Sequence, residues 1–193
     1  MLVLQPNAEQ GKDAVIWTER PDRSYPNHND FQAMGWTWYA HNFDGGIRRS
    51  LIEFDLSSIP PESTIEEATL SLYFNPQSAE IPSTQGHSQR DGSNRSILSR
   101  ITSPWTEDLV TWNNQPSIST DNQIYVKASD VAEEDYQIDV KNLIEDMVND
   151  PSKSFGFLYQ LDNENYYRAM IFASSDHENE DLHPKLEVRY TVR

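Results

Sequence analysis

The residues best suited to binding chemistry are aromatic, and they gather in the segment MGWTWYAHNFDGG, which covers residues 34–46. Trp36 and Trp38 would share one face of this segment if it is extended, because side chains alternate along an extended chain. Exposed aromatic rings stack on the C–H face of sugars, and a few polar groups then fix the orientation of the ligand. The predicted ligand platform consists of Trp36, Trp38, Tyr39, Asn42, Asp44, Arg48, Tyr166 and Tyr167.

Two other interpretations of the aromatic segment remain open. Its rings can pack a long amino-terminal segment against the β-sandwich. They can also bury against a neighbouring subunit, since aromatic residues are enriched in protein interfaces.

Three acidic residues are candidates for a structural calcium site. Calcium prefers hard oxygen ligands and tolerates irregular geometry, which suits the carboxylates of Asp13, Asp30 and Asp176. Asp176 opens an acidic cluster at 176–181, just before the last strand-like run. The chain lacks EF-hand spacing, so a solvated acidic loop is the alternative interpretation of this cluster.

Catalytic signatures are absent from the sequence. It contains no HExxH, no GxSxG, no phosphate-binding glycine loop and no cysteine. The five histidines stand in polar contexts without metal-ligand spacing, and we expect them at the surface. Glu107 could serve a glycosidase as one of two carboxylates, but a structural role as an acceptor for backbone donors explains it better. We therefore expect a non-catalytic protein.

The charge of the chain disfavours some partners. Its 31 acidic and 15 basic side chains give a formal net charge of -16, which repels nucleic acid. The same charge disfavours an acidic polysaccharide unless a cation or a local basic patch compensates. Arg90, Arg95 and Arg100 are the candidates for such a patch, with solvated surface arginines as the alternative. The expected ligand is a neutral glycan.

The sequence carries no targeting signal that we can identify. The opening MLVLQPNAEQ lacks a basic segment followed by an apolar stretch, so no signal peptide is present in the given chain. A membrane span is not expected either, because no apolar run is long enough. We expect an extracellular protein, or one associated with a surface or a particle.

The elements that must position these residues are mostly strands. Runs bounded by turn residues predict strands at 13–18, 48–55, 68–74, 96–101, 124–127, 155–161, 169–173 and 185–192. Apolar residues at helical spacing predict one short amphipathic helix at about 140–149, with Asp139 as its N-cap. A polar stretch at about 75–95 predicts a long, mobile surface loop. Together these elements predict an all-β fold, a jelly-roll-like antiparallel β-sandwich. It forms a single domain over residues 1–193.

Three motifs give a more specific indication of the fold. They are RSLIEFDLSSIPPESTIEEATLSL at 49–72, SPWTEDLVTWNNQP at 103–116 and FASSDHENEDLHPKLEVRY at 172–190. In this order and spacing the chain resembles the DNRLRE domain family, also called disaggregatase-related repeats, which overlaps one carbohydrate-binding module family. The resemblance implies a single β-sandwich of the kind appended to secreted or surface proteins. Trp105 and Trp112 belong to its motif, and we expect them to pack as structural residues.

The sequence therefore predicts a non-catalytic extracellular recognition or adhesion module that binds a glycan. The alternative is a structural or decoration subunit of a surface layer, fibre or phage-like extracellular particle, in which the aromatic segment contacts other subunits.

Overall fold

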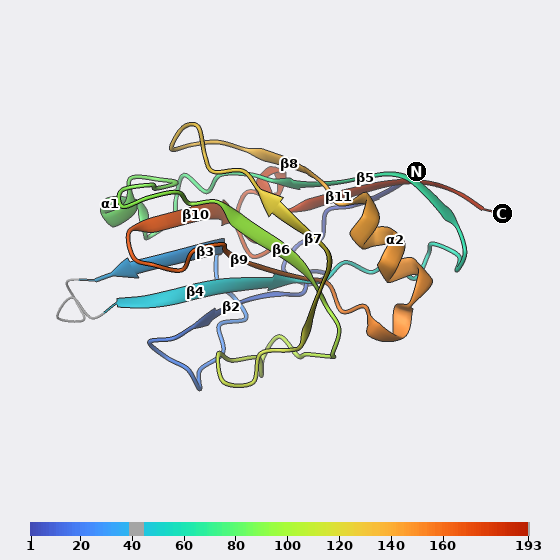
Figure 1. Ribbon diagram of the computed structural model, residues 1–193, viewed down its shortest axis with the longest axis horizontal. Helices are drawn as coiled ribbons and strands as arrows, with labels where there is room; N and C mark the ends of the chain where they lie inside the picture. The colour runs from blue at the N-terminus through green and yellow to red at the C-terminus, as the bar shows by residue number, and fades with distance from the viewer. Residues whose placement is uncertain (39–44, 193) are drawn as a thin grey trace.

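The computed structural model describes residues 1–38 and 45–192, and it confirms the predicted all-β sandwich of two antiparallel sheets (Figure 1). The smaller sheet has the order β1 (Leu2–Leu4), β11 (Lys185–Thr191), β5 (Thr64–Leu72) and β8 (Tyr136–Asp139). The larger sheet has the order β10 (Arg168–Ala173), β3 (Asp30–Thr37), β4 (Gly45–Ile52), β9 (Phe157–Leu161), β6 (Ser96–Ile101) and β7 (Ile118–Val126), with β2 (Asp13–Trp17) also paired to β4.

The main core lies between the two sheets. Leu186 on β11 faces Leu70 on β5 in register, and both side chains are fully buried, as their alternation with polar neighbours predicts. Phe31, Tyr159 and Phe172 meet them from the larger sheet, with ring centroids 5.4 to 6.0 Å apart. Burying each side chain of this size contributes about 1.5–3 kcal/mol.

One helix covers the core near the termini, as its sequence pattern predicts. α2 (Lys141–Asn149) buries Leu143, Ile144 and Met147 against β5 and ends before the short 3-10 helix η2 (Pro151–Lys153). The N-cap residue is Val140, not the predicted Asp139, but the Asp139 carboxylate still accepts a hydrogen bond from the Lys141 amide (3.0 Å). Among the described residues, no helix has the length and apolar character needed to cross a membrane.

Three strands lack the sequence signals used to predict the others. β1 and β8 are only three and four residues long. Almost every residue of β3 is buried, so DFQAMGWT shows no polar alternation and resembles a loop. Trp36 therefore lies in the interior of a strand and not in the loop predicted for it.

The polar stretch at 75–95 is not the mobile surface loop that its composition predicts. It contains α1 (Ile81–Thr84) and buries several polar side chains that find partners inside the fold. Asn75 donates to the Asp30 carboxylate (2.7 Å), and Asn94 donates to the Ala169 carbonyl (3.0 Å). Buried polar groups with such partners anchor the segment to β3 and β10.

Three of the four histidines that the structure describes are buried, contrary to the surface location expected for them. The Ile171 amide donates to His87 Nδ1 (3.0 Å), and His87 Nε2 lies 2.8 Å from the Glu134 carbonyl. Burial lowers the pKa of His87. His177 and His183 are buried beside the 3-10 helix η3 (Glu180–Leu182), where His183 Nε2 lies 2.7 Å from the His177 carbonyl.

Candidate functional site

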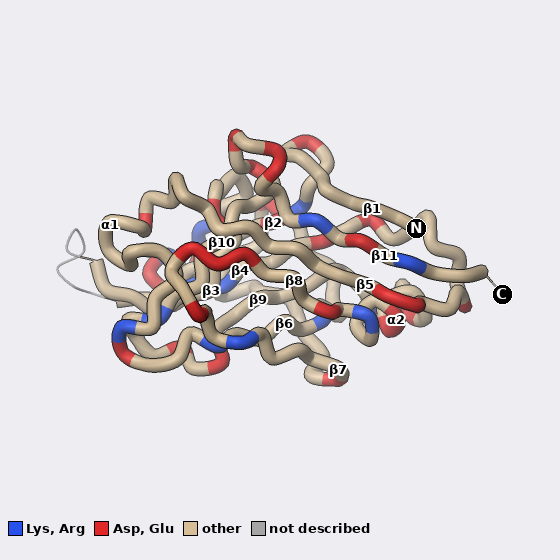
Figure 2. Tube along the Cα trace, turned by 90° about the horizontal axis from the view of Figure 1, so that it is seen from above, with Lys and Arg blue, Asp and Glu red and all other residues tan. Residues whose placement is uncertain are grey.

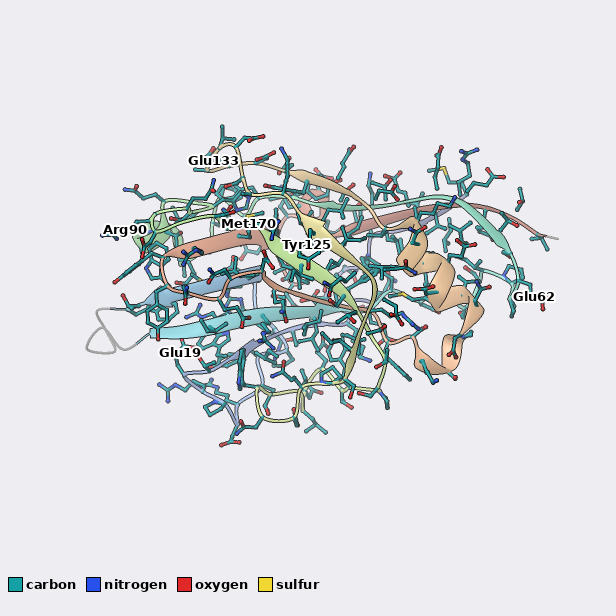
Figure 3. All side chains as sticks on the ribbon, in the orientation of Figure 1. Glu19, Glu62, Arg90, Tyr125, Glu133 and Met170 are labelled. Carbon is teal, nitrogen blue, oxygen red and sulfur yellow. The ribbon has the colours of Figure 1, made fainter. Side chains whose placement is uncertain are left out.

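The aromatic residues gather at the end of the sandwich that carries α1, the end of β3 and the start of β4. Figure 3 places Glu19 and Arg90 at this end and Glu62 at the opposite one. β2 ends here at Trp17, and the Trp17 ring stacks on Tyr25 with 3.8 Å between ring centroids and 16° between the planes. The Arg48 guanidinium lies 3.9 Å from the Trp17 ring. Two planar groups this close must occupy opposite faces of the indole.

Trp38 completes this arrangement from the other side of Arg48, with 4.2 Å between the guanidinium and the ring centroid. We call Tyr25, Trp17, Arg48 and Trp38 the aromatic stack. Trp38 and Arg48 were both predicted members of the ligand platform, whereas Trp17 and Tyr25 were not among the predicted site residues. A cation–π contact contributes about 0.5–1 kcal/mol at an exposed site and about 2 kcal/mol when desolvated, so the two contacts of Arg48 stabilise the stack.

Two carboxylates compensate the charge inside the aromatic stack. Arg48 is only 5% exposed, and its Nη1 donates to Glu80 Oε1 (2.6 Å). The same Glu80 accepts a hydrogen bond from Trp38 Nε1 through Oε2 (2.8 Å), and Glu19 lies 3.8 Å from Arg48 Nε. Glu80 directly precedes α1, so the polar segment at 75–95 supplies a residue that orders the stack.

Trp36 is not part of an exposed platform. It is 3% exposed and packs with Met34, Ala169 and Ile171 on the outer face of the larger sheet. Tyr167 covers it edge-on, with ring centroids 5.2 Å apart. For Trp36, the packing interpretation is therefore the correct one.

The neighbouring tyrosines differ in exposure. Tyr166 is 42% exposed and lies flat against β4, because Gly45 has no side chain: a Cβ there would overlap the Tyr166 ring. The Tyr167 hydroxyl is 3.1 Å from Thr37 Oγ1, and Arg90 lies over the Tyr167 ring at 5.0 Å. The remaining predicted residues, Tyr39, Asn42 and Asp44, lie outside the described part of the chain.

A polar pocket of about 370 Å³ lies next to Tyr167, on the β9–β10 side. Ser93, Arg95, Asp162, Asn163 and Arg168 line it, and we call it the arginine pocket. Arg95 is paired with Asp162. The predicted patch of Arg90, Arg95 and Arg100 is not formed as such, because Arg100 donates to the Lys153 carbonyl at the other end of β6 (3.0 Å).

Arg168 is the unusual member of the arginine pocket. It is 9% exposed, yet within 1–38 and 45–192 it forms no ion pair with a carboxylate. Its Nη1 donates to the Tyr166 carbonyl (3.2 Å), and its Nε has no hydrogen-bond partner. A buried charge is costly unless it is paired, so an anionic group in this pocket would relieve a real electrostatic penalty.

The motif tryptophans are structural, as predicted. Trp105 is buried in a second apolar cluster on the outer face of the larger sheet, and its Nε1 donates to the Phe155 carbonyl (2.8 Å). Glu107 Oε1 accepts from the Asp13 amide at the start of β2 (2.8 Å), which confirms its role as an acceptor for a backbone donor. Trp112 packs under Arg49, with 4.5 Å between guanidinium and ring.

The predicted calcium ligands do not converge on one point. Asp13 Oδ2 accepts from the Ser175 amide (2.9 Å) and hydroxyl (2.5 Å), whereas Asp30 accepts from Asn75 and Ser78 in a different network. No group of three or more acidic, histidine or cysteine side chains could hold a metal ion in the part of the chain that the structure describes.

Asp13 and Asp176 do influence each other electrostatically. Burial raises the pKa of Asp13 to about 7, despite the hydrogen bonds from Ser175, and the charges of Asp176 and Glu107 add to the increase. Burial also raises the pKa of Asp176 to about 6, and its Oδ2 is buried without a partner. These carboxylates therefore repel one another when ionised.

The sequence identified some members of this end and missed others. Trp38, Arg48, Tyr166 and Tyr167 were predicted and lie here. Trp17, Tyr25, Glu80 and Arg168 were not. Trp17 and Glu80 were missed because they contact Arg48 from segments far away in the sequence. Arg168 directly follows Tyr166 and Tyr167, which were predicted site residues, and this position is the sequence feature that could have indicated it.

Comparison with protein families gives a match over most of the chain. The model of carbohydrate-binding module family 96 matches residues 7–190, which include the aromatic stack and the arginine pocket. No curated protein matches the chain. The predicted overlap with a carbohydrate-binding module family is confirmed, and the closer resemblance to the DNRLRE family stays a prediction.

Proposed function

The chain belongs to carbohydrate-binding module family 96, and from this membership we propose that it binds a glycan without catalysing a reaction on it. The proposed site is the end of the sandwich where Tyr166 presents a ring beside the aromatic stack. A sugar ring would stack on Tyr166, which is exposed and held in place by the contact of its ring with Gly45. The contacts of Arg48 with Trp17, Trp38 and Glu80 order the stack before a ligand binds, which lowers the entropic cost of binding.

We further propose that the bound glycan carries acidic groups. The observation that supports this is the buried Arg168, which has no carboxylate partner among the described residues although the protein has a net charge of -16. Arg95 lines the same pocket, where Asp162 compensates its charge, so the charge of Arg168 is the one left without a carboxylate partner among the described residues. This departs from the neutral glycan expected from net charge alone, because a local pocket can reverse the average potential of the surface.

The proposal includes a location outside the cell, where structural polysaccharides with acidic groups are accessible. Recognition or adhesion at a surface would then be the role of the module. Detection of the native protein in the culture medium or on the cell surface would support this location, and confinement to the cytoplasm would contradict it.

Binding to a panel of oligosaccharides tests the proposed site. Calorimetry should show binding to uronic-acid oligosaccharides and weaker binding to neutral ones of the same length. A Tyr166→Ala variant should bind about three- to tenfold more weakly, because aromatic stacking contributes about 0.5–1.5 kcal/mol. The variant should keep its melting temperature, since the side chain is exposed.

A Leu109→Ala variant is the control, because it removes an exposed apolar side chain from the unrelated motif segment. It should bind like the wild-type protein. The proposed site is wrong if Tyr166→Ala binds normally, and the proposed function is wrong if no neutral or acidic glycan binds at all.

A structural calcium ion with Asp13, Asp30 and Asp176 as ligands stays a separate prediction, and Asp13 and Asp176 are the two of these whose charges interact. Because their charges repel, calcium bound between them should raise the melting temperature at pH 8, and chelator should reverse the increase. Asp176→Asn should abolish the response. The calcium prediction is contradicted if the melting temperature, measured by calorimetry, is the same with calcium and with chelator.

A further inference from the structure

The sandwich is open along one side, between the last strands of its two sheets. β7 ends the order of the larger sheet and β8 ends that of the smaller one, with the 127–135 connection joining them (Figure 1). A groove of about 680 Å³ separates them, and Val126, Tyr136 and Ile138 form its buried apolar floor. Tyr125 stands at its rim, near the middle of the molecule in Figure 3.

β7 presents a short straight edge to this groove. Its register with β6 shifts between Ser119 and Ile124, where Asn122 has a φ of 55° and donates to Asp146 of α2 (2.9 Å). This bulge bends the first half of β7 towards α2 and leaves residues 124–126 extended. In the described chain, their main chain hydrogen-bonds to β6 alone, so the outward N–H and C=O groups can pair with another strand.

The charged side chains that line the groove already have partners. Lys127 contacts both Asp130 and Glu134 at 2.7 Å. The Asp135 carboxylate accepts from the Phe74 amide (2.8 Å), and Asp139 accepts from the Lys141 amide. A sugar would have to displace these contacts to bind here. An extended peptide would instead use the main-chain groups of β7 that have no partner.

The negative charge at the groove favours a peptide that carries positive charge. Residues 127–139 contain five carboxylates, Asp130, Glu133, Glu134, Asp135 and Asp139, against the single base Lys127. Figure 2 shows the acidic run in the connection that leads into β8. A second copy of this chain is a poor occupant, because it would bring an equally acidic edge and a net charge of -16 to the interface.

We propose that the β7–β8 groove binds an extended peptide segment in which basic and apolar residues alternate, added as a strand to the edge of β7. The apolar side chains enter the groove above Val126 and Ile138, and the basic ones face the acidic rim. Both strands rise about 3.3 Å per residue, so about three residues of the segment pair with residues 124–126, and the flanking residues extend along the groove. This site is separate from the proposed glycan site and does not depend on it.

Nuclear magnetic resonance with a defined probe tests the proposal. The probe is an acetylated and amidated hexapeptide of alternating lysine and valine. On titration into the full chain, amide signals of residues 124–127 and 136–139 should shift, and the exchange of the β7 edge amides with solvent should slow. The same hexapeptide with glutamate in place of lysine should not bind, and neither should a version N-methylated at every residue.

A charge variant and its matched control localise the binding. Glu133→Lys with Gln137→Lys should weaken binding of the probe at least tenfold, and within residues 1–38 and 45–192 neither native side chain makes a hydrogen bond that the change would break. Glu62→Lys with Gln10→Lys changes the net charge equally at the other end of the molecule and should bind normally. Tyr166→Ala should also bind normally, which separates this test from that of glycan binding.

Three outcomes would overturn the proposal. One is the absence of signal shifts at β7 and β8 with the lysine–valine peptide. Another is equal binding of the N-methylated peptide, which would mean non-specific attraction to an acidic surface. The third is equal weakening by the two charge variants.

Discussion

An Arg168→Met variant is expected to be more stable than the wild-type protein and to lose its affinity for acidic glycans. Arg168 is buried at the start of β10, and its charge has no carboxylate partner among the described residues. Methionine has a similar length and no charge, so it removes the electrostatic penalty while retaining most of the packing. The expected gain in the free energy of unfolding is about 1–3 kcal/mol, by analogy with buried charges replaced by apolar residues.

The expected loss of affinity has the same cause. If an anionic group on the glycan pairs with Arg168, its removal leaves that group desolvated without a partner, which costs about 2–5 kcal/mol of binding free energy. This corresponds to a loss of roughly 30-fold or more in affinity. Urea denaturation measures the first effect, and calorimetry with a uronic-acid oligosaccharide measures the second.

Arg100→Met is the matched control for this variant. Arg100 also has a buried Nε without a partner, but it lies at the other end of β6 and does not line the arginine pocket. It should leave glycan affinity unchanged. An Arg168→Met variant that is less stable and binds acidic glycans normally would show that Arg168 is simply a packing residue.

An Asp13→Asn variant is expected to be more stable than the wild-type protein at pH 8 and much less sensitive to pH. Burial raises the folded-state pKa of Asp13 from 3.8 to about 7, so the folded protein holds this proton more tightly than the unfolded chain. The stabilisation from protonated Asp13 is fully present below pH 4 and is lost as the pH rises towards 7 and beyond. The raised pKa of Asp176 acts in the same direction.

The size of this effect follows from the pKa shift. Each pKa unit corresponds to about 1.36 kcal/mol, so the loss for Asp13 is at most about 4 kcal/mol. Asparagine keeps the acceptor for the Ser175 amide and carries no charge, so the variant should avoid this loss at pH 8. Denaturation curves between pH 5 and pH 8, recorded with chelator present, measure both the stability and its slope.

Asp55→Asn is a suitable comparison, because hydrogen bonds from Ser57 lower the pKa of Asp55 instead of raising it. It should leave the pH dependence between pH 5 and pH 8 unchanged. The explanation fails if Asp13→Asn shows the same slope as the wild-type protein.

The parts of the fold that sequence predicted well are those with a strong local pattern. β11 and β5 alternate apolar and polar residues because one face of each strand is exposed to solvent. α2 has a single apolar stripe. β3 was missed because both of its faces are buried, Trp36 included, which removes the alternation. Burial on both faces is a property of the assembled sandwich, and no local window of sequence contains it.

The candidate site shows the same division. Trp38 and Arg48 were predicted from neighbouring positions in the chain, and they are in contact. Their carboxylate partner Glu80 belongs to a segment whose polar composition predicts a surface loop. The isolation of Arg168 could not be predicted, because it depends on which carboxylates other segments bring near it.

The packing of the tryptophans affects the fluorescence of this protein. Four of the five indoles have a cation over the ring: Lys12 over Trp105, Arg48 over Trp17 and Trp38, and Arg49 over Trp112. A charge above an indole ring shifts its emission, so a small displacement of Arg48 alters the fluorescence of two residues at once. The protein thus contains its own spectroscopic probe at the end where we place the glycan, and ligand titrations can be followed without a label.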